Sequence, residues 1–267
     1  VRVAVIAYDA REQVIDTNSI LLPMDVIQPN ETVPFDISLY GLVETPLSYE
    51  VIVQGRQEVN LPAKQAQTPF HVKNYAHYSD SFGRLNIVGE TINDGVVTAT
   101  AIKIVAAMLD ENGDVLAVST SNWNGLELVP PGGQYPFGFQ FGDEARDWKQ
   151  VEIQIQAQPY EPVMAYFKPH EGLKLLGLSG AVPESSWGGY KVSGQVVNDG
   201  NVAANWIKIV AIAYDANGAV IDVGSGTPKL DGDLQPGASA PFDLEFRGLK
   251  NEPNSYQAFV EGREARQ

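Results

Sequence analysis

One stretch of mainly apolar residues, IKIVAIAYDANGAVID at 207–222, occurs three times along the chain. The other copies are IKIVAAMLDENGDVLA at 102–117 and VRVAVIAYDAREQVID at 1–16. Repetition at an interval of about 100 residues decides the architecture, because each copy is expected to form the same structural unit. We therefore interpret the 267-residue chain as two complete units preceded by part of another.

Matching spacings extend the repeat beyond this first run. In each copy an aspartate closes the run, and a Pro-Phe pair follows at a distance of 26 or 27 residues. Another alternating run begins 14 residues after the phenylalanine. The landmarks are Asp9, Phe35 and Tyr49 in the first copy, Asp110, Phe137 and Val151 in the second, and Asp215, Phe242 and Tyr256 in the third. These spacings predict the same succession of strands in all three copies.

Apolar and polar residues alternate in the later runs, as they do in strands with one buried face. In the third copy Phe242 and Leu244 are expected to face a core, while Asp243 faces solvent. The same alternation predicts strands over 35–39, 137–141, 49–55, 151–157 and 256–262.

The organising run differs because both of its faces are mainly apolar. Over 207–214 the outward row includes Val210 and Ile212, which is typical of a central strand whose second face is also partly covered. After the closing aspartate, Asn-Gly pairs in the second and third copies tolerate positive φ and predict a hairpin. The first copy has Arg11-Glu12 at this place, so we expect a different turn there.

A glycine-bearing unit precedes the organising run in two copies. LNIVGETINDG at 85–95 matches YKVSGQVVNDG at 190–200, and Gly89 and Gly194 predict a bulge or a close approach of another backbone. The matching unit of the first copy would lie before Val1. Either residues ahead of Val1 supply these strands or the protein lacks them, and we favour the first, because an incomplete sandwich exposes apolar edges. If the strands are lacking, the first repeat is expected to borrow an edge from its neighbour or from a second chain.

Together these units predict an all-β fold of tandem Ig-like antiparallel β-sandwich repeats, two complete and one truncated at its N-terminus. The expected domains are 1–58, 68–160 and 170–267, and proline-containing linkers are expected to restrain them. No segment of ten or more residues has a 3.6-residue period, so very little helix is expected.

The composition narrows the possible partners. A formal net charge of −15 disfavours nucleic acid and anionic lipid, since both are bound through basic patches. No apolar run approaches the roughly 18 residues that span a bilayer as a helix. The absence of cysteine excludes disulfides, zinc-thiolate sites and thiol catalysis, and it leaves the compartment open.

The succession of strands and turns resembles the FxLYD domain family. The residues that carry the resemblance are Gly194, Asn198, Tyr214-Asp215-Ala216, Asn217-Gly218, Pro236-Gly237 and Phe242. The second copy departs at Leu109, where the other copies have tyrosine, and the first copy lacks the glycine after Pro29. The resemblance implies a β-sandwich module of prokaryotic extracellular or cell-surface proteins. It implies no catalytic residues, cofactor or metal.

Two polar features have a structural interpretation beside a functional one. The segment at 110–114, DENGD, resembles the start of a calcium loop, but Ser121 stands where the twelfth-position carboxylate is expected, so a hairpin turn is favoured. His71, His77 and His170 lie in or beside the predicted linkers. Solvated surface histidines are favoured over a metal site.

Trp123 and Trp148 are the candidates for ligand contact. Both lie in predicted loops of the second copy and have no counterpart in the first. Exposed aromatic rings can stack on sugars or anchor a protein partner, although loop tryptophans more often fold back over the end of a sandwich. Asn30 begins a glycosylation sequon that is interpreted as coincidental in a prokaryotic protein.

The predicted function is that of a non-catalytic extracytoplasmic spacer or protein-interaction module. The alternative is a carbohydrate- or cation-binding protein that uses loops at one end of a sandwich. The least favoured hypothesis is an enzyme with Asp and Glu side chains in a cleft between domains. The sequence identifies neither the protein or glycan partner nor the oligomeric state.

Overall fold

The computed structural model describes residues 1–267 except 57–68, 122–124, 164, 184–188 and 266–267. In the described part of the chain, the one helical element is a short 3-10 turn, η1 (Asp143–Ala145), and all other regular structure is strand. The prediction of an all-β fold with very little helix is therefore confirmed. None of the described helical structure has the length and apolar character needed to cross a membrane.

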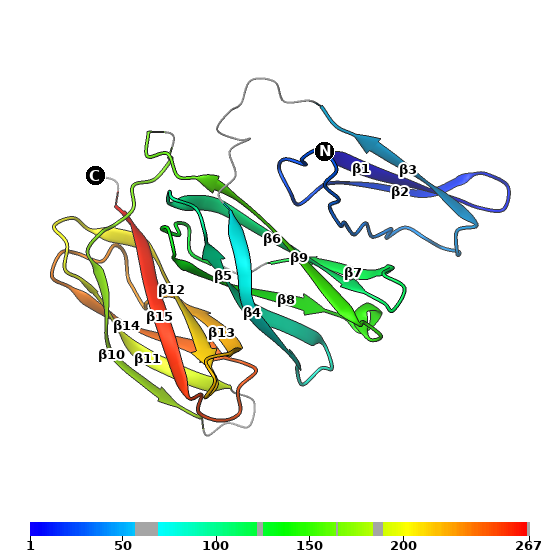
Figure 1. The fold of residues 1–267 in the computed structure, drawn as a ribbon. Helices are drawn as coiled ribbons and strands as arrows, with labels where there is room; N and C mark the ends of the chain where they lie inside the picture. Colours follow the sequence, from blue (N-terminus) through cyan, green and yellow to red (C-terminus); the bar gives the residue numbers. More distant parts are fainter. Residues whose placement is uncertain (57–68, 122–124, 164, 184–188, 266–267) are drawn as a thin grey trace.

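Residues 170–267, the third repeat, form two three-stranded antiparallel sheets that pack as a sandwich (Figure 1). The strands are β10 (Leu173–Ala181), β11 (Tyr190–Asn198), β12 (Ala204–Tyr214), β13 (Val220–Gly226), β14 (Ser239–Phe246) and β15 (Ser255–Glu264). One sheet has the order β10-β11-β14 and the other β13-β12-β15. Val192 and Phe242 of one sheet meet Ile209 of the other in the core, so this Phe row faces inward as predicted.

The second repeat, residues 68–160, has the same arrangement. Its strands are β4 (Phe70–Ser79), β5 (Leu85–Asn93), β6 (Ala99–Leu109), β7 (Val115–Thr120), β8 (Gln134–Phe141) and β9 (Gln150–Pro159). The sheets β4-β5-β8 and β7-β6-β9 enclose a core that includes Ile87, Ile104 and Phe137. Phe137 lies on β8, which is hydrogen-bonded to β5, as β14 is to β11.

The first repeat, residues 1–58, contains a single sheet in the described part. Its strands, β1 (Arg2–Tyr8), β2 (Val14–Leu21) and β3 (Ser48–Gln54), have the order β2-β1-β3, matching β13-β12-β15. The strand predicted over 35–39 is wrong, because these residues form no strand. The physical reason is the missing partner: β8 and β14 are strands through their pairing with β5 and β11, and the described residues of the first repeat include no strand that pairs with 35–39.

The turn after the organising strand is the same in all three repeats, so the expectation of a different turn in the first is wrong. Asp9 Oδ1 accepts the backbone N–H groups of Arg11 and Gln13 at 2.7 and 2.8 Å, the pattern that Asp215 repeats. Glu12 has φ +59°, close to the +78° of Gly218 at the equivalent place. The first repeat therefore keeps the turn by placing a non-glycine residue in the left-handed region.

The glycines of this unit allow another backbone to approach closely, as predicted, and they also allow the approach of an aromatic ring. A Cβ on Gly89 would lie 2.4 Å from the Phe137 ring and 2.7 Å from the Asn74 carbonyl oxygen. A Cβ on Gly194 would lie 3.0 Å from the Phe242 ring. Glycine at this place lets the inward phenylalanine of the neighbouring strand lie directly over the backbone.

Buried asparagines close the following turn in both complete repeats. Asn93 Nδ2 donates to the carbonyl oxygens of Val97 and Val129 at 3.0 and 2.8 Å. Asn198 donates in the same way to the equivalent carbonyls in the third repeat. Each side chain satisfies buried carbonyls of two chain segments, which fixes the end of the sandwich.

Candidate functional site at the repeat junctions

The second and third repeats meet through the outward faces of two sheets, β4-β5-β8 and β13-β12-β15. An apolar cluster fills this contact and consists of Val88, Ile212, Tyr214, Val220 and Val223, with Ala76, Tyr78 and Phe259 packed against it. The prediction that the organising strand is covered on its second face is therefore confirmed for β12, and a neighbouring repeat provides the cover.

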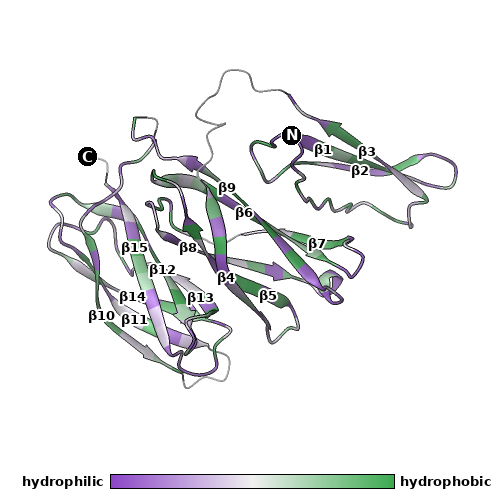
Figure 2. Ribbon diagram, viewed as in Figure 1, coloured by the Kyte–Doolittle hydropathy of each residue, from purple (hydrophilic) through white to green (hydrophobic). Residues whose placement is uncertain are grey.

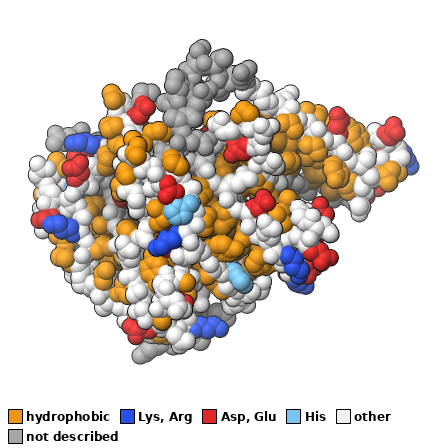
Figure 3. Space-filling view, viewed as in Figure 1, with side chains coloured by type: hydrophobic (Ala, Val, Ile, Leu, Met, Phe, Trp, Pro, Cys, Tyr) orange, Lys and Arg blue, Asp and Glu red, His pale blue; other side chains and the backbone are white. Residues whose placement is uncertain are grey.

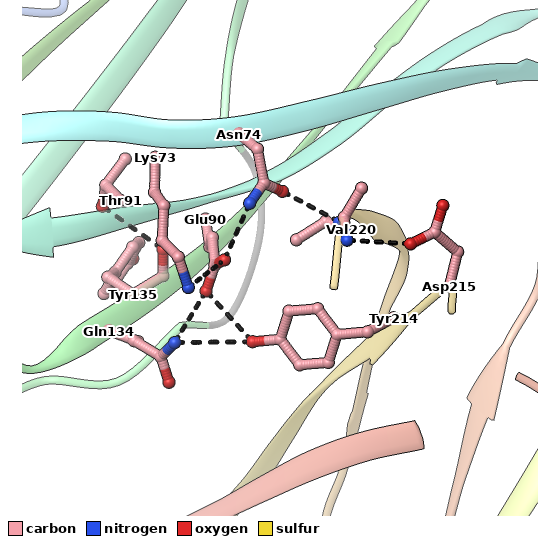
Figure 4. Close-up of polar contacts among 10 residues, drawn as sticks. Lys73, Asn74, Glu90, Thr91, Gln134, Tyr135, Tyr214, Asp215 and Val220 are labelled. Atoms are coloured by element: carbon pink, nitrogen blue, oxygen red, sulfur yellow. Dashed lines mark hydrogen bonds and ion pairs between the residues drawn. The ribbon is translucent and has the colours of Figure 1, made fainter. Parts of the chain in front are cut away.

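A fully buried carboxylate, that of Glu90 on β5, lies within this junction (Figure 4). One of its oxygens accepts hydrogen bonds from the Tyr214 hydroxyl at 3.0 Å and from Gln134 Nε2 at 2.9 Å. The other accepts from Asn74 Nδ2 at 3.1 Å and pairs with Lys73 Nζ at 2.9 Å. Burial of a charge is unfavourable unless it is paired and hydrogen-bonded, and four groups meet that requirement here.

The same network joins the two repeats in both directions. Tyr214 of the third repeat donates to Glu90 of the second, and Asn74 of the second accepts the Val220 backbone N–H of the third at 2.9 Å. Burial, followed by the charge of Glu90, raises the pKa of the Tyr214 hydroxyl. The phenol therefore stays a neutral donor, and the directional bonds fix the relative position of the repeats.

Residue differences between the copies make this network specific to one junction. Tyr214 corresponds to Leu109 in the second copy and to Tyr8 in the first, where the hydroxyl donates to Glu50 on the surface of its own sheet at 3.1 Å. Glu90 follows Gly89, and the residue after Gly194 is Gln195. The sequence analysis did not predict this network. The one sign of it in the sequence was Leu109, which stands where the other two copies have tyrosine.

A second polar contact lies at one margin of the junction. Glu261 on β15 accepts the backbone N–H groups of Glu127 and Leu128 in the second repeat. Burial raises the pKa of Glu261 to about 7. Arg263 pairs with the Glu127 carboxylate through two nitrogens, with Nε 2.9 Å from Oε2. Main-chain and ionic contacts therefore reinforce the apolar cluster.

A cleft of about 520 Å³ opens at the other margin, lined by both repeats. Asp80 and Arg84 of the second repeat and Arg247 of the third lie along it. Nearby, Asp222 is buried and accepts the backbone N–H of Gly248 at 2.7 Å, and burial raises its pKa to about 6. Asp80 is held by the Arg84 side chain at 2.8 Å and by the backbone of its own turn.

The first and second repeats meet differently. Gln156 on β9 accepts the Asp25 N–H at 2.7 Å and donates to the Val26 carbonyl at 2.7 Å, while Met24 and Val33 pack on Val105. These contacts come from the segment 22–33, since the described strands β1 to β3 pair only with one another. Among the described residues, no strand of the first repeat pairs with its neighbour. The borrowing of an edge from a second chain, expected if the upstream strands are lacking, stays a prediction.

The tryptophan candidates have different outcomes. Trp148 is half-buried, packs against the second core and lies edge-on to His77, with ring centroids 5.2 Å apart. Trp123 lies outside the described residues. Asn30, the sequon asparagine, is exposed in a loop with φ +66°.

Two of the three histidines are exposed, as favoured, and the other is buried. His71 and His77 lie within β4 and are exposed, and His71 pairs with Asp94 at 2.7 Å. His170 is buried, accepts the Gly172 N–H at 3.0 Å and lies 3.0 Å from the Val202 carbonyl oxygen. Solvated surface histidine is thus wrong for His170, because its ring satisfies buried main-chain groups.

The segment at 110–114 is a hairpin turn, as favoured. Asp110 Oδ1 accepts the backbone N–H groups of Asp114 and Asn112 at 2.9 and 2.8 Å. These bonds hold the pKa of Asp110 below its usual range. One carboxylate oxygen is therefore already committed to the turn.

An aromatic surface beside the linker also went unpredicted. Arg263 lies 5.2, 4.6 and 5.1 Å from the ring centroids of Tyr166, Phe167 and Trp206. Trp206 is 68% exposed and has φ +49°, in a bulge where the second repeat has Ala101 at +50°. The bulge turns a large ring outward at a place where the second repeat has a methyl group.

No protein-family model and no curated protein matches this chain. Among solved structures, a red sea bream transglutaminase is similar over 72% of this chain, with 12% sequence identity and a TM-score of 0.21. The chain spans 29% of that enzyme's length, and so low a TM-score supports no conclusion about fold or activity.

Proposed function

We propose that this chain is a non-catalytic extracytoplasmic repeat protein that acts as a stiff spacer or protein-interaction module. The observation that carries the proposal is the junction of the second and third repeats. An apolar cluster and a buried carboxylate with four partners lie there, so hinge motion would expose apolar surface and uncouple Glu90 from Tyr214. Contacts of this kind suit a module whose role depends on fixed geometry.

The polar groups of the junction support a structural role over a catalytic one. Catalytic acids and bases need access to a substrate and a free lone pair or proton. Glu90 is enclosed, and Glu261 accepts two backbone N–H groups. The FxLYD resemblance, which implies tandem modules outside the cytoplasm, agrees with this proposal.

Distance measurements between spin labels test the stiffness. The chain has no cysteine, so a Glu111→Cys, Lys250→Cys double variant carries one label on an exposed turn of each complete repeat. A narrow distance distribution is expected from double electron–electron resonance. A broad distribution would contradict the spacer role.

A matched control adds Val88→Asp to the labelled chain. Val88 faces the neighbouring repeat rather than the core of its own, so the second repeat is expected to stay folded while the junction opens. The distance distribution should widen in this variant. An unchanged distribution would mean that the apolar cluster does not hold the repeats together.

The aromatic surface supports a second candidate function, the binding of carbohydrate. Trp206 and Tyr166 are 68% and 71% exposed, and both line one hollow. Exposed rings of this kind can stack on sugar faces. Calorimetric titration with a glycan panel tests this function: Trp206→Ala should abolish saturable heat, whereas Phe82→Ala, which removes an exposed ring elsewhere, should not. Equal heat from both variants would contradict it.

A further inference from the structure

The hollow beside the linker of the second and third repeats combines exposed aromatic rings with polar groups. Its volume is about 880 Å³, within the roughly 300–1,000 Å³ that small-ligand sites occupy. Trp206 and Tyr166 line it as exposed rings, and Asn205, Lys168 and Glu264 are its polar side chains. In the space-filling view, hydrophobic side chains lie beside acidic and basic ones at the upper left, near the C-terminal end of the chain (Figure 3).

Trp206 is larger than its place in the fold requires. Its φ of +49° is unfavourable for a residue with a large side chain, and the second repeat forms the same bulge with Ala101 at +50°. The indole is 68% exposed, so it adds little to the core of the third repeat. The fold therefore needs the bulge but not a large ring upon it, and a strained residue of this kind points to contact with a ligand.

Arg263 on β15 holds the rings of the hollow in place. Its guanidinium carbon lies 5.2, 4.6 and 5.1 Å from the ring centroids of Tyr166, Phe167 and Trp206. The same guanidinium is anchored by the Glu127 carboxylate of the second repeat, and hydrophilic colouring marks this end of β15 (Figure 2). Because the rings are ordered before a ligand arrives, binding loses less conformational entropy.

The charges around the hollow favour a neutral ligand. Lys168 Nζ pairs with Glu264 at 2.7 Å, and Arg263 pairs with Glu127, so both cations that line the hollow among the described residues have a carboxylate partner. The chain as a whole carries a net charge of −15, which repels an anion. A cationic ligand would meet rings whose centre is already filled by the Arg263 guanidinium.

Asn205 supplies a polar group that is not committed elsewhere. It precedes Trp206 on β12 and is half-buried in the lining of the hollow. Its side-chain amide forms no hydrogen bond with the described residues. An amide donates two hydrogen atoms and accepts at its oxygen, so it can bind two neighbouring hydroxyl groups of one ligand.

We propose that this hollow binds a neutral polysaccharide of cellulose type, with the face of one glucose unit on Trp206 and two neighbouring hydroxyl groups on Asn205. The inference rests on the carbohydrate-binding function proposed above and adds the class of sugar and the residue that selects it. Glucose units in β linkage carry all their hydroxyl groups equatorially, so both faces of each unit present C–H bonds, against which an indole ring packs. An axial hydroxyl would be desolvated against the ring without a partner.

Calorimetric titration of the full chain with cellohexaose tests this inference, and saturable heat is expected. Mannohexaose of the same linkage differs by one axial hydroxyl in each unit and should bind roughly ten-fold more weakly. Cellohexaose oxidised to the uronic acid carries carboxylates on the same backbone and should give no saturable heat, because the acidic chain repels it.

Substitution of Asn205 tests its part in the selection. Asn205→Ala should weaken the binding of cellohexaose roughly ten-fold, since the contacts to the two hydroxyl groups are lost. Asn205→Asp keeps the shape of the side chain, removes both donors and should weaken binding as well. Asn251→Ala removes an exposed asparagine outside the hollow and should leave binding unchanged.

The outcomes separate this inference from the function on which it rests. Heat from another glycan but none from cellohexaose would overturn the class of sugar and leave carbohydrate binding in place. Absence of heat from every glycan would overturn both. Equal affinity for cellohexaose and mannohexaose would refute selection by the C–H face, and unchanged binding in both Asn205 variants would refute the role of the amide.

Discussion

The first and third repeats contain the same three-stranded sheet, in the same strand order and with the same aspartate-closed turn. In the third, β10, β11 and β14 cover the inner face, and the row of Tyr256, Ala258 and Val260 becomes part of a core. In the first, the described residues provide no covering sheet, and the equivalent row is exposed. The comparison shows that the alternating pattern of a segment is enough to form the sheet. The inner row of that sheet becomes part of a core only where a second sheet packs against it.

Truncation of the inward phenylalanine should give the largest difference in destabilisation between these repeats. Phe242→Ala is expected to destabilise the third repeat by about 3–5 kcal/mol, because it leaves a cavity in a closed core. Phe35→Ala is expected to cost less than about 1 kcal/mol, because the ring is partly in water already. Native-state hydrogen exchange reads the stability of each repeat separately. A loss of equal size at both positions would show that the first repeat has a closed core in solution.

This contrast also separates what the sequence could and could not predict. Alternation of period two is a local property, so the strands around Val151 and Phe242 followed from the residues alone. Strand 35–39 did not, because Phe35, Ile37 and Leu39 have the right alternation without a hydrogen-bonding partner. Pairing is a property of two segments, and one pattern carries no information about the second.

Removal of the hydroxyl from the tyrosine of the organising strand should give the next largest difference in stability between the first and third repeats. Tyr214→Phe removes a donor from the buried carboxylate of Glu90 and is expected to cost about 1.5–3 kcal/mol. Tyr8→Phe removes an exposed bond to Glu50, and less than about 0.5 kcal/mol is expected. Both stability costs can be measured by urea unfolding, with hydrogen exchange used to follow each repeat separately. Matching effects would mean that the buried network adds no stability to the junction.

The candidate site was less predictable than the fold, for a physical reason. Glu90 looks like one more outward polar residue of an alternating strand, and its burial depends on a neighbouring repeat. Ligand candidates such as Trp148 were chosen as loop aromatics, yet this ring packs on the second core. A site made by the docking of two domains appears in neither sequence segment alone.

Two buried carboxyl groups predict that the stability of the second and third repeats depends on pH. The first repeat is expected to lack this dependence. Burial raises the pKa of Asp222 to about 6 and that of Glu261 to about 7, above the usual values of 3.8 and 4.5. The folded state then binds more protons than the unfolded state between those values, so stability falls as pH rises through this window. Lowering the pH from 8 to 5 is expected to add on the order of 4 kcal/mol to the unfolding free energy, of which Glu261 contributes the larger part.

Urea unfolding at a series of pH values measures this effect in the second and third repeats. Glu261→Gln should remove the part of the gain that titrates between about pH 4.5 and 7, and Asp222→Asn the part between about pH 3.8 and 6. The first repeat is expected to change little, since no acidic side chain is buried among its described residues. A gain that survives both substitutions would assign the pH dependence to the overall negative charge instead.

The shared turn gives the smallest and most local difference. Glu12 holds φ +59°, a conformation that is unfavourable for a residue with a Cβ, whereas Gly218 adopts +78° without that penalty. Glu12→Gly should stabilise the first repeat by up to about 1 kcal/mol, and Gly218→Ala should destabilise the third by about 1 kcal/mol. Both hairpins keep the same aspartate bonds, so the substitutions isolate backbone strain from hydrogen bonding. Hydrogen exchange at Gln13 and Ala219, whose N–H groups bond to the aspartates, reads the two turns in one experiment. Faster exchange at Gln13 in Glu12→Gly would mean that the Glu12 side chain stabilises the turn more than its backbone strain opposes it.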